Sequence, residues 1–262
     1  MKKKFITPVL AFVALSILVV SCKKDEDTTP TPGTGTGTGT SSGATAPTPD
    51  VGSVDGLLLS LRLDLATETA GFVVNVATEN ALATFFTSTG SSSSFEDGGV
   101  VKVNTFELEK QTNNSYIKTA TTGMTPSDLN FDSDKSEWDV AGAGSVPAFT
   151  YNHNSTFPSF TDTLPTTVNR SADFTIDFTG KASGADSIII MIAKDDKSIV
   201  KTFAGTAASG TITASEMSIL PAVTDKTAIL EVVPYNFTTS VQGGKTYAFI
   251  KQYALVTYVN LN

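Results

Sequence analysis

The sequence predicts an all-β protein, organised as two β-sandwich modules in tandem. Apolar and polar residues alternate along most of the chain beyond residue 50, and a period of two is typical of strands with one buried face. Gly, Asn and Asp lie between these runs, where turns are expected. In the first half of this region no run with helical periodicity extends beyond two turns. These observations together favour strands over helices.

The composition argues against several classes of function. The chain has 262 residues, enough for one large or two small domains. Its formal net charge is −8, which argues against nucleic acid as a partner because binding phosphates requires a cationic surface. One His and one Cys are too few ligands for a zinc or iron–sulfur site, and a single Cys cannot form a disulfide within the chain.

The N-terminal segment has the layout of a secretory signal peptide. Lys2–Lys4 form a basic start, and an apolar run of 16 residues, Phe5–Val20, precedes Ser21 and Cys22. This run is shorter than the roughly 20 residues that a helix needs to cross a bilayer. We therefore expect residues 1–21 to be a signal peptide rather than a permanent membrane span.

The end of that segment resembles the lipobox of bacterial lipoproteins. The matching residues are Val19, Val20, Ser21 and Cys22, and the resemblance implies cleavage before Cys22 and transfer of a diacylglycerol with palmitate-type chains to its thiol. The following stretch, Lys23–Asp27, looks like the export signal of Bacteroidota-type surface lipoproteins, which implies an outer-membrane location facing the cell surface. The alternatives are an ordinary signal peptide with a chance Cys, and a solvated linker start with retention facing the periplasm.

Residues 22–50 are expected to form a lipidated, disordered linker. From Thr28 to Asp50 the chain is rich in Thr, Gly, Pro and Ser, a composition that cannot bury a core. A flexible tether of this length has an r.m.s. span of roughly 25–32 Å. Removal of residues 1–21 takes away three lysines, which leaves 15 basic and 26 acidic residues and a net charge of −11.

The first module is assigned to residues 51–160. Its clearest strand is Leu57–Leu65, where five leucines alternate with other residues and would share one face. Asn113 and Asn114 favour a hairpin loop over Lys110–Ser115. The other expected strands are around Phe72–Val76, Ala83–Phe86, Val101–Val103, Thr105–Glu109, Tyr116–Thr119 and Trp138–Val140.

The second module is assigned to residues 161–262 and is predicted to be immunoglobulin-like, although the Cys-Trp-Cys pattern is absent. Ser187–Ala193 is apolar on both sides, as expected of a central strand. A helical turn is predicted over Ser215–Leu220, with Ser215 as N-cap and Pro221 ending it. The other expected strands are Phe174–Phe178, Ile199–Phe203, Gly210–Thr213, Ala228–Tyr235 and Thr246–Leu261. The alternative architecture is one larger sandwich or barrel.

An aromatic segment is the first candidate binding site. Phe149, Tyr151 and Phe157 lie among amides and hydroxyls close to His153. Rings that stack on sugar C–H groups, with amides to satisfy hydroxyls, are what a glycan-binding surface requires. The alternative is that these rings pack between the two modules.

An acidic stretch is the second candidate, as a calcium site. Asp132, Asp134 and Glu137 offer oxygen ligands at short spacing, which a hard cation accepts. The stretch departs from an EF-hand loop because Lys135 interrupts it and no Gly stands at the turn. The alternative is a solvated loop.

Two threonines are candidate O-glycosylation sites. Thr28 and Thr163 each follow an Asp, and their surroundings resemble the Asp-Ser/Thr-apolar acceptor of Bacteroidota-type secreted proteins. The resemblance implies modification in the linker and in one loop. The similar triplet at Asp186–Ile188 is expected to be blocked at a strand start.

These features favour a non-enzymatic cell-surface lipoprotein whose β-rich body is a structural or binding module without a cofactor. Its expected partners are the outer membrane, through the lipid anchor, and a glycan or an envelope protein. The alternative is a glycan-binding accessory lipoprotein similar to those of starch-utilisation systems. A glycoside-active enzyme is third, because carboxylate pairs cannot be located from sequence. A serine hydrolase is disfavoured, since no Gly-x-Ser-x-Gly motif accompanies the single His.

Overall fold

The computed structural model describes residues 54–69, 72–87, 95–119, 129–131 and 134–262. Within these ranges the chain is built from β-strands, with a single short helix, α2 (Ala214–Met217). The prediction of an all-β protein is confirmed. The predicted signal peptide, Cys22, the linker and Thr28 lie outside the described residues. No helix in the described ranges is long and apolar enough to span a membrane.

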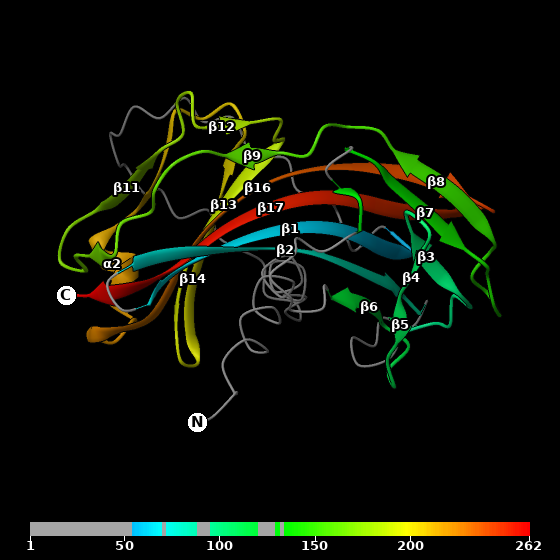
Figure 1. Cartoon of the computed structure of the whole chain (residues 1–262), viewed down its shortest axis with the longest axis horizontal. Helices are drawn as coiled ribbons and strands as arrows, with labels where there is room; N and C mark the ends of the chain where they lie inside the picture. Colours follow the sequence, from blue (N-terminus) through cyan, green and yellow to red (C-terminus); the bar gives the residue numbers. More distant parts are fainter. Residues whose placement is uncertain (1–53, 70–71, 88–94, 120–128, 132–133) are drawn as a thin grey trace, which may run out of the picture.

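One long sheet, the main sheet, runs through the molecule (Figure 1). Its strands are much longer at the centre than at the edges. Among the described residues it has nine strands, with β10 (Thr167–Val168) beside β17 and the others in the order β14 (Lys197–Ala204), β13 (Ser187–Lys194), β16 (Val223–Gln242), β17 (Lys245–Leu261), β1 (Gly56–Thr69), β2 (Phe72–Phe85), β6 (Tyr116–Thr119), β5 (Glu109–Lys110).

The first and last strands pair at the centre of this sheet. β1 and β17 run parallel, with partners from Gly56↔Tyr247 to Ala66↔Thr257. In Figure 1 the blue strand β1 accordingly lies beside the red strand β17. The first and last strands of the described chain are thereby hydrogen-bonded to each other. Because β17 is the last strand in the sequence, this ladder can form only after the other strands have been synthesised.

Period-two patterns account for the two faces of the main sheet. In β1, Leu57 and Leu59 belong to one buried cluster, whereas Leu58 between them belongs to another. In β17, Phe249 and Ile250 divide between the same two clusters. Both faces of the sheet are therefore apolar at its centre.

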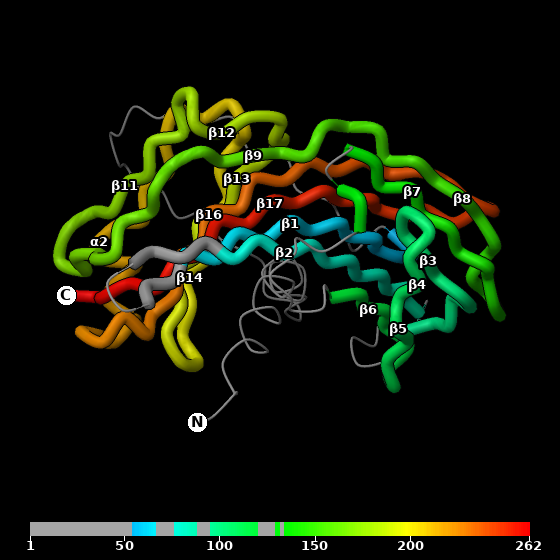
Figure 2. Tube along the Cα trace, in the orientation of Figure 1, coloured from blue at the N-terminus to red at the C-terminus, as the bar shows by residue number. Residues whose placement is uncertain are grey.

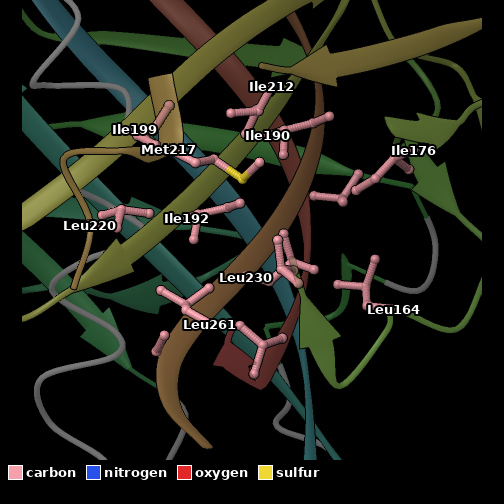
Figure 3. Close-up of a cluster of buried hydrophobic side chains, with 14 of the residues drawn as sticks. Leu164, Ile176, Ile190, Ile192, Ile199, Ile212, Met217, Leu220, Leu230 and Leu261 are labelled. Atoms are coloured by element: carbon pink, nitrogen blue, oxygen red, sulfur yellow. The ribbon is translucent and has the colours of Figure 1, made fainter. Parts of the chain in front are cut away.

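Further layers cover one face of the main sheet, as the tube in Figure 2 shows. At one end, side chains of a four-stranded sheet join those of β1, β2 and β17 in a buried cluster that includes Trp138. At the other end, two short ladders and α2 pack against β13, β16 and β17, where Ile190, Ile192 and Leu230 meet Met217 (Figure 3). The four-stranded sheet comprises β4 (Phe106–Glu107), β3 (Val101–Val103), β7 (Ser136–Val140) and β8 (Phe149–His153), and the ladders are β9 (Ser159–Phe160) with β12 (Ala182–Ser183) and β11 (Phe174–Asp177) with β15 (Ser209–Ile212).

The strand pairing corrects the predicted division into tandem modules 51–160 and 161–262. Strands β1 and β2 from the first half and β16 and β17 from the second half belong to one sheet. Only the layers that cover the main sheet divide by sequence. The buried cluster around Trp138 comes mainly from the first half of the chain, and the cluster around Met217 comes from the second half. A period of two shows which residues share a face, but it does not specify which strand lies beside which.

Local predictions were met in part. The Lys110–Ser115 hairpin is confirmed, since Glu109 and Lys110 pair with Ile117 and Tyr116. The N-cap of the helical turn is Thr213, not Ser215. The Thr213 hydroxyl accepts from the Glu216 N–H, and the Glu216 carboxylate accepts from the Thr213 N–H at 2.7 Å. Thr213 is favoured over Ser215 because Glu216 stands three positions later and completes a reciprocal capping box.

Candidate functional site

The predicted aromatic segment meets the main sheet in a cluster of buried polar groups. β7 and β8 place Ser136 beside His153, which are cross-strand partners. Below them, the main sheet pairs Ser60 with Lys251 and Arg62 with Glu79. We call the following residues the interlayer polar cluster: Ser60, Arg62, Glu79, Ser136, His153, Phe157 and Lys251.

Lys251 links the two layers of the cluster. Its side chain is fully buried on β17, and its ammonium donates hydrogen bonds to the backbone carbonyls of Asp134 and Ser155. The pKa of Lys251 is lowered to about 8, mainly by burial and to a smaller extent by the charge of Arg62, while the negative charge of Asp134 acts in the opposite direction. A cation is thus held where solvent cannot screen it.

Phe157 lies against two cations of the main sheet. The Lys251 ammonium is 4.9 Å from the centroid of its ring, and the Arg62 guanidinium carbon is 4.6 Å from it. Arg62 also faces Glu79, with 3.6 Å between Nε and Oε1. The second oxygen of Glu79 accepts from the Phe131 N–H at 3.3 Å. The cation–π contacts with Phe157 and the hydrogen bond from Phe131 therefore hold the covering segments onto β1, β2 and β17, while the Arg62–Glu79 ion pair joins two strands of the main sheet.

His153 is neutral in this environment. Its side chain is 2% exposed, and burial, with a smaller contribution from the charge of Lys251, lowers its pKa to about 4. Neither of its ring nitrogens has a hydrogen-bond partner among the described residues. The same holds there for the hydroxyls of Ser60 and Ser136. No carboxylate orients the imidazole in the described part of the chain, so the arrangement lacks the polarised base of a catalytic triad.

The aromatic rings do not form the predicted exposed platform. Phe149 and Phe157 are 8% and 4% exposed. The ring centroids of Phe149 and Tyr247 are 4.8 Å apart. The half-buried Tyr151 stacks on Phe249, with 3.9 Å between the ring centroids. The prediction that Phe149, Tyr151, His153 and Phe157 present a glycan-binding surface is therefore corrected, because these side chains are engaged in packing between the covering layer and the main sheet.

Of the three predicted calcium ligands, the structure describes Asp134 and Glu137. Asp134 has a carboxylate oxygen that accepts from the Phe157 N–H at 3.1 Å, and Glu137 is exposed on β7. Asp132 lies outside the described residues. Across the described ranges no group of three or more His, Cys, Asp or Glu side chains is placed to hold a metal ion. Calcium binding stays a prediction that involves a residue the structure does not describe.

Thr163 is placed where a modifying enzyme could reach it. The residue is exposed after β9, and its N–H donates to Asp162 at 2.8 Å. Asp162 also pairs with Lys181 at 2.7 Å. Ser187, in the similar third triplet, is fully buried. Accessibility thus separates two triplets that look alike in sequence, and glycosylation of Thr163 remains a prediction.

Five members of the interlayer polar cluster were missed by the sequence analysis: Ser60, Arg62, Glu79, Ser136 and Lys251. Lys251 carried a usable signal, since it directly follows the apolar run Tyr247–Ile250 within a predicted strand. Arg62 and Glu79 carried none, because a charged residue at every second position is also what a solvated strand face shows.

Comparison with known proteins finds no family model, no curated protein and no solved structure that matches the chain.

Proposed function

We propose that the protein is a lipid-anchored outer-membrane protein facing the cell surface, whose β-rich body is a non-enzymatic structural or binding module. The observation that carries the proposal is the order of N-terminal features: a basic start, the apolar run Phe5–Val20, Ser21, Cys22 and then a hydrophilic tether. A multiply acylated Cys would hold the chain at a membrane, since each buried methylene contributes about 0.8 kcal/mol.

The position of the first strand supports the same proposal. β1 starts at Gly56, directly after the Thr- and Gly-rich stretch. A tether of this composition would hold the body clear of the lipid headgroups. The non-enzymatic part is supported by the interlayer polar cluster, whose ionisable side chains contact other groups between two layers.

The anchor is tested by substituting Cys22→Ser and growing the host with radiolabelled palmitate. The unmodified chain should carry the label and partition into detergent, whereas Cys22→Ser should lose the label. Ser42→Ala, in the same tether, is the matched control and should behave like the unmodified chain. Mature protein that partitions into buffer with an unmodified Cys22 thiol would refute the proposal.

The side of the membrane is tested separately, with protease added to intact cells. The body should be digested when residues 25–27 are acidic, and it should become protected when Asp25, Glu26 and Asp27 are all replaced by Ala. Protection of the unmodified chain would place it on the periplasmic side and leave the lipid anchor intact.

A further inference from the structure

One margin of the main sheet is formed by a long strand that has a neighbour on one side only. β14 pairs with β13 over eight residues, from Ser187↔Ala204 to Lys194↔Lys197, and the described residues supply no strand beyond it (Figure 1). The opposite margin is formed by β6, of four residues, and β5, of two. The two margins therefore differ in how much unpaired backbone they present.

The register of β14 shows which of its backbone groups point away from β13. The Gly205 N–H donates to the Asp186 carbonyl at 2.8 Å, so Gly205 faces β13. Because the direction alternates along an antiparallel strand, Ser198, Val200 and Thr202 direct their N–H and C=O groups outward. Within the described ranges no backbone hydrogen bond is formed to these outward groups.

β14 lacks most of the features that protect a free strand edge. Soluble proteins shorten such strands, interrupt them with Pro or a bulge, or place charged side chains along them. β14 contains no Pro, and its register with β13 runs without a bulge. The Lys201 ammonium is turned onto the covering layer, 3.1 Å from the Glu216 carboxylate and 2.9 Å from the Thr211 carbonyl. Lys197, next to the turn, is the only exposed charged residue of β14.

Two-fold symmetry allows β14 to pair with β14 of a second copy. Such a contact is antiparallel, and residues with outward backbone groups must lie opposite one another. A two-fold axis at Val200 places this residue opposite its own copy, and it places Ser198 opposite Thr202 of the second copy. All the outward residues of β14 then exchange backbone hydrogen bonds with the second copy.

Charge favours this register over its two neighbours. Both lysines lie opposite apolar side chains of the second copy, Lys197 opposite Phe203 and Lys201 opposite Ile199. An axis at Ile199 would instead place Lys197 opposite Lys201, and an axis at Lys201 would place this residue opposite its own copy. Like charges directly opposite each other are destabilising, whereas a Lys beside an aromatic ring is favourable. β14 is therefore complementary to itself in the register that uses all its outward residues.

We propose that the protein forms a two-fold symmetric dimer in which the β14 strands of two copies pair and join their main sheets into one. The partner of the open edge is thus a second copy of this chain. The proposal is carried by the length of β14, its outward backbone groups and its self-complementary register. It is independent of the lipid anchor, although two chains tethered to one membrane would meet more often.

An engineered disulfide tests the register in the full chain. Val200→Cys places a thiol at the axis, where paired Cα atoms are about 5.5 Å apart and within reach of a disulfide. Oxidation of membranes from the host should therefore give a covalent dimer on a non-reducing gel. Ser198→Cys is the matched control and should stay unlinked, because its two copies lie roughly 13 Å apart along the strands. The unmodified chain should also stay unlinked, which excludes a disulfide through Cys22.

Sedimentation of the detergent-solubilised chain tests the contact without a new thiol. The unmodified chain should sediment as two copies, and Val200→Pro should sediment as one, because it removes an outward N–H at the axis. Since that N–H does not face β13, the melting temperature of Val200→Pro should change little. Ile199→Pro is the control: it removes an N–H that faces Ile192 of β13, and it should lower the melting temperature.

Three results would overturn the proposal. The first is an unmodified chain that sediments as a single copy. The second is an equal yield of disulfide in Val200→Cys and Ser198→Cys, which would indicate random collision rather than a fixed register. The third is a dimer that Val200→Pro leaves intact. If both proline variants unfold, the two cysteine variants decide alone.

Discussion

At the scale of single residues, buried ionisable groups distinguish the molecule. The Lys251 ammonium is hydrogen-bonded to two backbone carbonyls, from Asp134 and Ser155, rather than to a carboxylate. A buried cation normally requires a compensating charge, and here part of that role falls to the ring of Phe157. Such a lysine restrains the two segments that supply its acceptors, which accounts for its place between β17 and the covering layer.

His153 should make stability depend on pH. Its pKa is about 4 in the folded protein and 6.5 in an unfolded chain, so the unfolded state binds the additional proton between these values. The free energy of unfolding should therefore fall as pH drops through this window, by about 2 kcal/mol between pH 7 and pH 5. Urea denaturation at both pH values should show this loss to be smaller in His153→Gln. An unchanged loss in the variant would contradict the assignment.

Thr105 carries local backbone strain. Its φ is +76°, in a two-residue turn with Asn104 between the paired residues Val103 and Phe106. A β-branched side chain is disfavoured there. Thr105→Gly should raise the free energy of unfolding by about 0.5–1 kcal/mol, measured by denaturant titration. Thr150→Gly, in the extended strand β8, is the control and should lower it, so a decrease in both variants would argue against strain at Thr105.

At the scale of elements, long strands were predicted well and short connections less well. Alternating leucines identified β1, and the apolar runs identified β13 and β17. A strand buried on one face has apolar residues at every second position, and a strand buried on both faces has a continuous apolar run. The segment Glu79–Phe85 contains the helix formers Ala81, Leu82 and Ala83, yet it lies in the long strand β2 and pairs with β1. Pairing with β1 overrides the local propensity of this segment.

The reciprocal cap of α2 should stabilise the end that contacts the apolar cluster of Figure 3. Met217 is buried in that cluster, and Thr213 and Glu216 satisfy each other's backbone N–H groups. Thr213→Ala should lower the free energy of unfolding by about 1 kcal/mol. Thr213→Ser keeps the oxygen acceptor and should stay within about 0.5 kcal/mol of the parent. Equal losses in the two variants would indicate that the Thr213 methyl group, not the cap, is responsible.

At the scale of the whole molecule, the main sheet makes one unit of two halves. The covering layers form separate cores around Trp138 and Met217, but both rest on a sheet whose centre is β1 beside β17. Each half of the chain alone would keep most of its covering layer but would expose the strand edge along which β1 and β17 pair. The interlayer polar cluster also joins the two halves of the chain, since its members range from Ser60 on β1 to Lys251 on β17.

Unfolding should therefore be cooperative across the described body. Calorimetry should give a single transition with equal calorimetric and van't Hoff enthalpies. The fragments 54–160 and 161–262, prepared separately, should lack cooperative transitions, whereas their mixture should regain one if β1 can still pair with β17. Two transitions in the full chain, or a stable isolated fragment, would support independent modules instead.

The sequence by itself determined the strand content, the faces that each strand buries and the N-terminal signals that motivate the lipoprotein proposal. These properties depend on neighbours within a few residues, and the period of two records them directly. Only the tertiary structure decided that β1 pairs with β17, that Phe149 and Phe157 pack inward, and that Lys251 lies beside His153. These are contacts between segments distant in the chain, and they depend on which of several compatible strands become neighbours in one sheet.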